Sequence, residues 1–256
     1  MSIQSSPLAP SNQQVVRITI DRSRPHHVAQ MEALQRRVYA MEPDDTDGIL
    51  LAQHFLHHQA IFPEGQFVAL DHGRVVGLTV SMRLAFDPER PFIEPWMETI
   101  GNGWLTRHDP AGEWMYGVES CVDPDYQGRG IGGALIEARF QTARELNLRG
   151  MVAGSALISY AEVSAEITPE QYIDGVISGR FFDRNLTKQL RKGFKVCGLI
   201  PNYVDDESTR GWGAVIVWHN PDYDPTGARR SSVARRHRYR MTLRQPHHLP
   251  AAAGLA

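Results

Sequence analysis

Cysteine is scarce in this sequence: its 256 residues include only Cys121 and Cys197, and there is no CxxC pair. Both cysteines lie in apolar surroundings, which predicts buried free thiols in a reducing compartment. No stretch approaches the roughly 20 apolar residues of a membrane span. The polar N-terminus also lacks the basic flank and apolar stretch of a signal peptide. We therefore expect a cytoplasmic protein without a membrane partner.

Acidic residues are missing from the C-terminus. From Arg229 onward the sequence contains seven arginines but no lysine, aspartate or glutamate. The preceding 228 residues carry the other 20 basic residues against all 29 acidic ones, a net charge of −9. An acidic body disfavours nucleic acid as a partner. The arginine-rich tail could contact phosphates or an acidic partner, but we interpret it as a solvated tail.

Metal-binding motifs are missing as well. His54, His57 and His58 fall in the string HFLHH, which lacks the glutamate of an HExxH metal site, and we interpret them as a solvent-facing side of a helix. The acidic stretch 42–48 is similar to a calcium loop, but Pro43 and His54 occupy its first and twelfth ligand positions. The sequence therefore predicts no metal site.

The remaining pattern alternates apolar strands with amphipathic helices. The predicted strands are residues 15–21, 66–70, 75–84, 114–122, 150–156, 193–204 and 212–220. The predicted helices are residues 26–41, 48–59, 131–147 and 183–192. This order describes one α/β domain (15–225) between a disordered N-terminus (1–14) and the Arg-rich tail (226–256). The segment 87–112, rich in Pro, Gly and Trp, is expected to be an insertion over one end of the sheet.

Four glycines lie within six positions between the strand 114–122 and the helix 131–147, namely Gly128, Gly130, Gly132 and Gly133. A Walker phosphate loop is excluded because no Lys follows the glycines. The dinucleotide fingerprint GxGxxG is formally present, but five residues (123–127) separate it from the strand, where the fingerprint requires a tight turn.

A third interpretation uses the wider pattern of strand, V-x-P-x-x-Q-G-x-G-x-G and helix. Glycines allow a ligand to approach the backbone closely, and their N–H groups can point into one cavity. Together with the N-terminus of the helix that begins at Ile131, these N–H groups form an anion site suited to a pyrophosphate. Pro124 prevents the strand from continuing its hydrogen-bond ladder.

These residues carry a resemblance to a known family. Val122, Pro124 and the string Gln127-Gly128-Arg129-Gly130-Ile131-Gly132 resemble the acyl-CoA-binding motif [RQ]-x-x-G-x-[GA] of the GNAT superfamily of N-acetyltransferases. The strings MYGVESCVDPDYQGRGIG, LNLRGMVAG and QLRKGFKVCGLIPNYV look like the GNAT domain that often precedes a carbon–nitrogen hydrolase (nitrilase-like) domain.

The resemblance implies an α/β fold of GNAT type, with a mixed, mostly antiparallel sheet of about seven strands flanked by helices. It covers roughly residues 15–225, and because the sequence ends at residue 256 we expect no hydrolase domain to follow. Any hydrolase partner would then be a separate chain. The sequence does not predict the oligomeric state.

The resemblance also implies where the cosubstrate acetyl-CoA binds: in a cleft where the strands 114–122 and 150–156 separate. Backbone near Val122 would hold the pantetheine arm and polarise the thioester carbonyl. Main-chain amides would hold the pyrophosphate, and the residues expected to supply them are Gln127, Gly128, Arg129, Gly130, Ile131, Gly132 and Gly133.

The candidates for the catalytic base lie on the strand 114–122. Strand alternation places Tyr116 on the face of Val122 and Glu119 on the other face, unless a β-bulge changes the alternation. Relatives carry a general-acid tyrosine four residues before the Gly-Phe that opens the next strand, but Gln189 occupies that position here. Tyr203 is the candidate to replace it.

The predicted function is transfer of an acetyl group from acetyl-CoA to a primary amine, carried either by a small molecule or by a protein. The segments 87–112 and 157–182 are expected to shape the acceptor site. Because the usual tyrosine is absent at Gln189, a second hypothesis is a non-catalytic acyl-CoA sensor or a partner module for a separate hydrolase. A third is a nicotinamide dinucleotide-binding protein.

Overall fold

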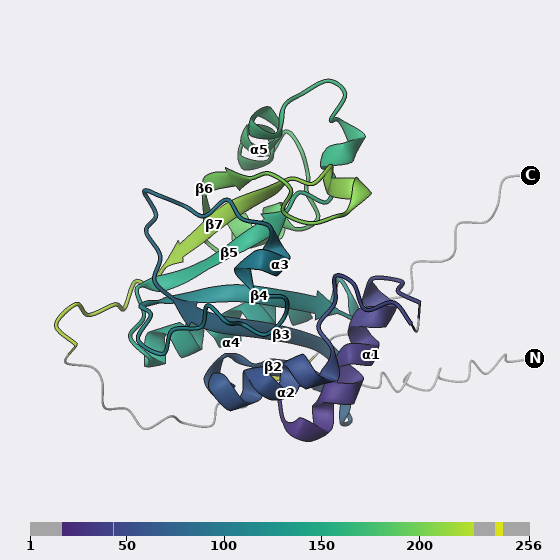
Figure 1. The fold of residues 1–256 in the computed structure, drawn as a ribbon, viewed down its shortest axis with the longest axis vertical. Helices are drawn as coiled ribbons and strands as arrows, with labels where there is room; N and C mark the ends of the chain where they lie inside the picture. Colours follow the sequence, from purple (N-terminus) through teal and green to yellow (C-terminus); the bar gives the residue numbers. More distant parts are fainter. Residues whose placement is uncertain (1–16, 43, 228–238, 243–256) are drawn as a thin grey trace, which may run out of the picture.

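The computed structural model describes residues 17–42, 44–227 and 239–242, which form one sheet with helices on both faces (Figure 1). The eight strands have the spatial order β6-β7-β5-β4-β3-β2-β1-β8. Their bounds are β1 Arg17–Arg22, β2 Phe67–Asp71, β3 Arg74–Leu84, β4 Trp114–Val122, β5 Gly150–Ala156, β6 Lys195–Ile200, β7 Gly213–His219 and β8 Tyr239–Thr242. Every neighbouring pair is antiparallel except β4 and β5, which are parallel.

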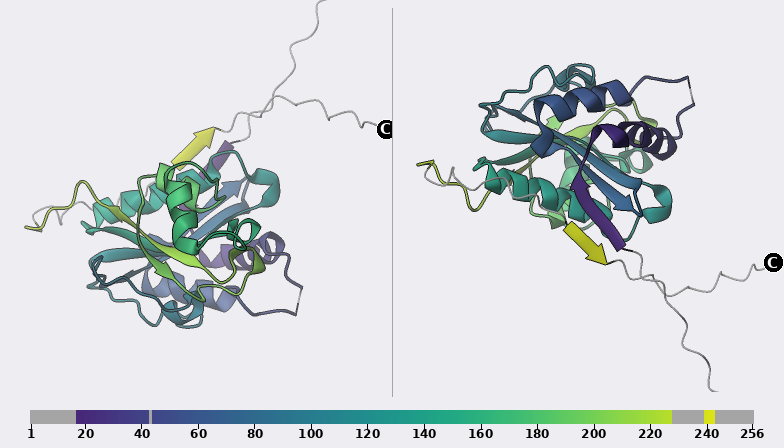
Figure 2. Two further views of the ribbon diagram at one scale, coloured as in Figure 1. Left: turned by 90° about the horizontal axis from the view of Figure 1, so that it is seen from above. Right: turned by 90° about the horizontal axis from the view of Figure 1, so that it is seen from below.

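The helices divide between the two faces of the sheet (Figure 2). Their bounds are α1 Val28–Val38, α2 Ala52–Ile61, α3 Trp96–Thr99, α4 Ile131–Glu145, α5 Pro169–Ile177 and α6 Leu186–Arg191. Helices α1, α2 and α3 share one buried cluster with residues of β3 and β4. Helix α4 packs on the opposite face in two clusters, one of which also contains residues of α5 and α6. We call these the α1 face and the α4 face.

The mixed, mostly antiparallel sheet predicted from the sequence is confirmed, and seven of the eight strands are the predicted ones. The hairpin between β2 and β3 turns at His72 and Gly73, both at positive φ (48° and 88°), as the Asp-His-Gly-Arg string indicates. The eighth strand, Tyr239–Thr242, belongs to the sequence that we interpreted as a solvated tail; it pairs with β1. Residues 1–14 lie outside the described part.

Strands β4 and β5 are paired only at one end. Their parallel ladder runs from Trp114 opposite Gly150 to Gly117 opposite Ala153. Beyond this point β5 continues along β7 to Ala156, while β4 continues along β3 to Val122. The two central strands therefore separate just past Gly117 and Ala153, the place where the sequence resemblance predicts the acetyl-CoA site.

A β-bulge in β4 changes which side chains share a face. Ser81 of β3 lies opposite Gly117, but Val80 lies opposite Glu119, so Val118 is an extra residue in β4. Both main-chain carbonyl groups at the bulge accept a hydrogen bond from a side chain. Trp96 Nε1 donates to Val118 O (2.8 Å), and Thr79 Oγ1 donates to Glu119 O (2.8 Å).

The bulge overturns one expectation. Tyr116 does not share a face with Val122, because Tyr116 packs in the cluster on the α1 face while Val122 packs with residues of α4. Because Val118 is an extra residue, the side chains of β4 beyond it point to the opposite faces from those expected for a regular strand. Glu119 therefore points to the α1 face, where its carboxylate contacts Tyr39 at the end of α1.

The histidines of α2 are also placed differently from the prediction. His54 and His58 are buried rather than solvent-facing, with exposed fractions of 7% and 0%. His58 Nε2 donates a hydrogen bond to Gly103 O (2.7 Å), and the His54 ring packs edge-on against Trp104. The 87–112 insertion lies over these side chains, so they attach it to α2 instead of facing water.

Candidate active site

The glycine loop begins at a buried carboxylate. Asp123 is 1% exposed; it accepts hydrogen bonds from the Asp125 N–H (3.0 Å) and from Arg74 Nη2 (2.8 Å). These contacts turn the chain away from β4 through a short 3-10 turn, Pro124–Tyr126. The turn separates the glycines from the strand, as the sequence indicates.

The glycines then bring the chain to the start of α4. Gly128 and Gly130 have φ values of 73° and 82°, in the left-handed region where glycine costs least. Gly130 is the N-cap of α4, and its lack of a side chain leaves the helix N-terminus without a capping side chain. The positive end of the helix dipole is therefore open to a ligand.

The main-chain amides of this loop are free. Six consecutive residues, from Gly128 to Gly133, have main-chain N–H groups that donate no hydrogen bond to any described residue. The next N–H group, of Ala134, donates to Gly130 O (3.0 Å). Six consecutive amides beside an uncapped helix N-terminus form an anion site of the kind that holds phosphate groups.

The other predicted loop residues support this arrangement. Gln127 Nε2 donates to Val122 O (3.1 Å), and Arg129 stacks over the Tyr126 ring at 5.2 Å. Because the Asp123 N–H donates to Val76 O on β3, the N–H of the preceding residue, Val122, points away from β3. Ile131 is buried beneath the loop, with its side chain against β3.

Lys192, which follows α6, lies beside this helix N-terminus. A β-carbon on Gly133 would be 3.1 Å from Lys192 Cε and 3.4 Å from its Nζ. A cation at the positive end of a helix is unfavourable by itself. Its presence there is consistent with an anionic ligand held by both groups.

Glu119 lies where β4 leaves β5. Its Oε1 accepts hydrogen bonds from Tyr39 Oη (2.8 Å) and from the N–H of Ser120 (2.8 Å). Burial raises the pKa of Glu119 above the ordinary value of a glutamate, although both hydrogen bonds oppose the rise. A carboxylate with a raised pKa accepts a proton more readily than that of an ordinary glutamate.

Tyr203 lies on the α1 face of the sheet, where its ring packs against two glycines. A β-carbon on Gly154 would overlap the Tyr203 ring and hydroxyl, and one on Gly213 would be 2.6 Å from Cδ1. Burial raises the pKa of Tyr203 well above its ordinary value, so the hydroxyl stays protonated. Gly154 follows Ala153, the last residue that β5 pairs with β4, so the hydroxyl lies at the point of separation.

Tyr116 completes the group of predicted catalytic side chains. It is fully buried, and its hydroxyl forms no hydrogen bond with any described residue. Tyr116 and Tyr203 are close enough for each to influence the pKa of the other, and burial raises the pKa of both. The bulge therefore brings Tyr116, Glu119 and Tyr203 together on the α1 face.

Gln189, at the position where the sequence resemblance predicts a tyrosine, lies in α6 on the other side of the sheet from Tyr203. Its Oε1 is buried and has no partner among the described residues.

The sequence did not predict two further residues of this region, Tyr39 and Arg139. Tyr39 gave no signal beyond an aromatic residue at a helix end. Arg139 could have been found as a basic residue four positions after Leu135, on the buried side of α4.

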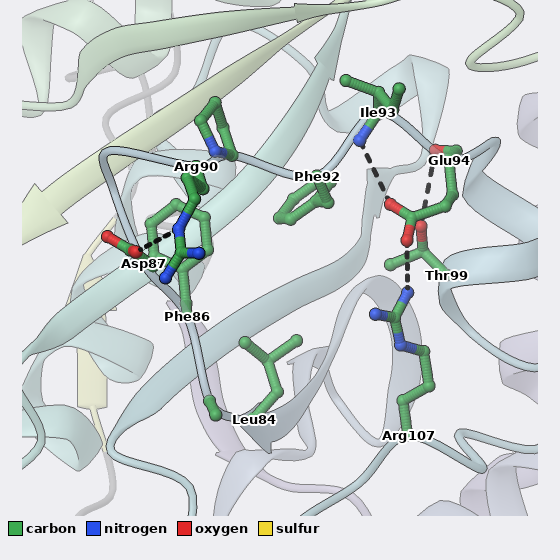
Figure 3. A pocket seen from close by; sticks show the side chains of 11 residues that line it. Leu84, Phe86, Asp87, Arg90, Phe92, Ile93, Glu94, Thr99 and Arg107 are labelled. Atoms are coloured by element: carbon green, nitrogen blue, oxygen red, sulfur yellow. Dashed lines mark hydrogen bonds and ion pairs between the residues drawn. The ribbon is translucent and has the colours of Figure 1, made fainter.

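A pocket of about 320 Å³ lies beside this group and is formed mainly by the 87–112 insertion (Figure 3). The Phe92 ring lines this pocket, and the distance between the ring centroids of Phe92 and Tyr116 is 5.5 Å. Arg107 Nη1 and Glu94 Oε1 approach to 3.4 Å at one end, while Arg90 and Asp87 pair at the other (Figure 3). The segment 157–182 instead supplies α5, which packs on the α4 face.

Two kinds of feature are absent from the described part of the chain. No three or more His, Cys, Asp or Glu side chains gather there to hold a metal ion. No helix there has both the length and the apolar character to cross a membrane. Cys121 and Cys197 are free thiols, as predicted, but only Cys121 is buried, whereas Cys197 is partly buried.

A pair of parallel strands that separate beside a run of free amides is an arrangement that can hold a phosphate-bearing cosubstrate. The sequence model described as "Acetyltransferase (GNAT) family" matches residues 28–162. The chain therefore belongs to the acetyltransferase (GNAT) family.

Two proteins of Bacillus subtilis (strain 168) are similar in sequence. The uncharacterized N-acetyltransferase YkwB is 30% identical over 166 residues, which cover 65% of this chain and 73% of YkwB. The probable hydrolase YhcX is 35% identical over 179 residues, which cover 70% of this chain but 35% of YhcX. The chain thus spans about a third of YhcX, and a link to a hydrolase stays a prediction.

Solved structures share the fold. The GNAT-like decarboxylase GphF, in complex with isobutyryl-CoA, is 24% identical with a TM-score of 0.65, over 78% of this chain and 98% of that one. The loading GNATL domain of CurA from Lyngbya majuscula is 17% identical with a TM-score of 0.64, over 79% and 98%. At these identities the likeness supports the fold alone.

Proposed function

We propose that this protein transfers the acetyl group of acetyl-CoA to a primary amine by direct attack of the amine on the thioester. The observation that carries the proposal is the run of six unpartnered amides from Gly128 to Gly133 at the N-terminus of α4. These amides would bind the pyrophosphate of CoA, with Lys192 adding a charge at the same place.

From the pyrophosphate the pantetheine arm would follow the free edge of β4. The outward-pointing N–H of Val122 offers it a hydrogen bond of the kind that a neighbouring strand would receive. The amide of Ser120 is not available, because Glu119 Oε1 already accepts from it. The thioester would thus reach the point beyond Gly117 and Ala153 where the strands separate.

Glu119 is proposed as the general base. It would take a proton from the substrate ammonium, after which the amine nitrogen attacks the thioester carbon and the new C–N bond forms. The C–S bond then breaks, and the second proton lost by the nitrogen passes to the departing thiolate. Positioned proton transfer contributes typically about 10²–10⁴ in rate. Tyr39 holds the carboxylate in place through the bond to Oε1.

Tyr203 is proposed to donate from its hydroxyl. Its hydroxyl remains protonated and can stabilise the developing negative charge or return a proton to the departing thiolate. Tyr116, whose hydroxyl is unpartnered, would orient the acceptor amine beside it.

The pocket lined by Phe92, Glu94 and Arg107 is the proposed entrance for the acceptor. It lies on the α1 face, opposite α4, so the amine would approach the thioester from the side away from the CoA loop. Both a small amine and a protein amine remain candidates.

The test is release of free CoA thiol from acetyl-CoA in the presence of a panel of small amines and peptides. We expect amine-dependent release in the wild type and its loss in Glu119→Gln with acetyl-CoA binding retained. Tight binding of acetyl-CoA without amine-dependent release across the panel would contradict the proposal and favour a binding module. Stabilisation of the fold by NAD and not by acetyl-CoA would contradict it more broadly.

A further inference from the structure

Arg139 of α4 is a buried cation without a partner of opposite charge. It is 5% exposed. Among the described residues it forms no ion pair within 4.0 Å and no hydrogen bond, and its Nε atom is buried and unpartnered. A charged guanidinium taken out of water is costly unless an anion or hydrogen-bond acceptors compensate it. A ligand that supplies an anion would remove this cost.

The guanidinium lies at the point where the central strands separate. A β-carbon on Gly117 would be 2.9 Å from Arg139 Nη1 and 3.3 Å from the β-carbon of Ala153. Gly117 and Ala153 are the last residues that β4 and β5 pair. Arg139 therefore reaches the inner end of the cleft from the α4 face.

No described carboxylate neutralises Arg139 directly. Glu119 is the one acidic group whose charge affects the Arg139 pKa, which burial lowers to about 10. The Glu119 carboxylate faces Tyr39 on the other side of β4, however, and is engaged there. Ser155, two residues beyond Ala153 on the same face of β5, adds a buried hydroxyl that also has no partner.

We infer that Arg139 forms a carboxylate-binding end of the acyl pocket, so that the protein accepts, beside acetyl-CoA, CoA thioesters whose acyl group ends in a carboxylate. The inference rests on the proposed function, because that function places the acyl group at the separation of β4 and β5. The acyl carboxylate would accept charge-assisted hydrogen bonds from the guanidinium. The bonds made and broken at the thioester are unchanged, and the carboxylate is retained in the product.

The test compares two donors of the same shape. Malonyl-CoA and isovaleryl-CoA match in size, but one acyl group ends in a carboxylate and the other in two methyl groups. Calorimetry with the full chain should give tighter binding of malonyl-CoA by tenfold or more, because a hydrogen bond to a charged group is worth about one to two factors of ten. Acetyl-CoA serves as the reference for the CoA loop.

Two variants separate charge from shape. In Arg139→Met, which keeps an unbranched side chain, the preference should reverse toward isovaleryl-CoA. Arg139→Lys should keep part of the preference for malonyl-CoA. Equal binding of the two donors by the wild type overturns the inference, even if a variant fails to fold. An unchanged ratio in Arg139→Met also overturns it.

These outcomes differ from a failure of the proposed function. If acetyl-CoA binds and supports transfer but malonyl-CoA has no advantage, only the role of Arg139 is wrong. If neither thioester binds, the CoA site itself is wrong. Transfer of a malonyl group to an amine, detected by mass, would support the inference as a second activity.

Discussion

The Tyr203 ring lies against Gly154, so closely that a β-carbon at position 154 would overlap the tyrosine hydroxyl. Gly213 on β7 leaves room for the other part of the same ring. The main-chain N–H of Tyr203 donates to Gly211 O (2.7 Å), and its carbonyl accepts from the Trp96 N–H (2.8 Å). Two strand glycines and two backbone hydrogen bonds therefore fix where this hydroxyl lies.

Replacing Gly154 by Ala should displace the Tyr203 hydroxyl and lower kcat by about tenfold or more, since a small misplacement at a reacting centre is costly. The dissociation constant for acetyl-CoA should change by less than about threefold. Steady-state kinetics and calorimetry measure the two quantities. Tyr203→Phe is the matched variant, and the double variant should be no slower than the slower single one. Additive losses would show that Gly154 does not act through Tyr203.

Glu119→Gln should lower kcat/KM by about 10²–10⁴ through loss of the general base. In the wild type, kcat/KM should fall as pH drops through the raised pKa of Glu119, at a higher pH than an ordinary glutamate would give. This acid limb should disappear in the variant. A pH–rate profile recorded on both proteins with one amine tests the assignment, and an unchanged limb in Glu119→Gln would exclude Glu119 as the base.

The same substitution should change stability in a defined direction. Because burial raises the pKa of Glu119, the folded chain binds this proton more tightly than the unfolded chain. Ionisation of Glu119 therefore costs stability as pH rises through its folded pKa. The free energy of unfolding of Glu119→Gln, relative to wild type, should increase from pH 4.5 to pH 8 in urea titrations. A constant or shrinking difference would contradict the raised pKa.

Lys192→Ala should weaken acetyl-CoA binding by about threefold to tenfold, because the ammonium lies beside the first turn of α4. The weakening should be smaller at high salt, which screens the lost attraction. Lys188, exposed on α6, provides the matched control, and Lys188→Ala should bind as the wild type does. Equal effects of the two substitutions would mean that only net charge matters.

His58 should make the fold sensitive to acid. Burial lowers its pKa to about 4, so the unfolded chain takes up the proton first as pH falls below 6.5. Stability is complete above that pH and decreases toward pH 4, by roughly 3 kcal/mol for a shift of this size. His58→Gln should flatten the pH dependence of the urea midpoint. Parallel slopes in the wild type and the variant would contradict this.

The sequence predicted the elements whose patterns are local. The string from Asp123 to Gly133 specifies a turn, two positive-φ glycines and a helix start, and the free amides found there depend on few other residues. Apolar periodicity was likewise sufficient for the seven predicted strands. These features could be predicted because short stretches of chain determine them.

The arrangement of the catalytic candidates could not be predicted in this way. The bulge at Val118 is held by Trp96 and Thr79, which are distant in sequence, and it decides that Tyr116 and Glu119 share a face. Tyr39 reaches Glu119 only because α1 packs over β4. His54 and His58 are buried because the 87–112 insertion lies over α2, which helical periodicity alone does not reveal.

Binding of the CoA pyrophosphate by the free loop amides is the claim on which the proposed mechanism depends. Protein labelled with ¹⁵N at its 22 glycines can be titrated with acetyl-CoA, and each amide proton followed by NMR. The amide protons of Gly128, Gly130, Gly132 and Gly133 should move downfield together as they donate to the phosphates. If these four signals stay in place while glycines elsewhere respond, the site and the mechanism built on it are contradicted.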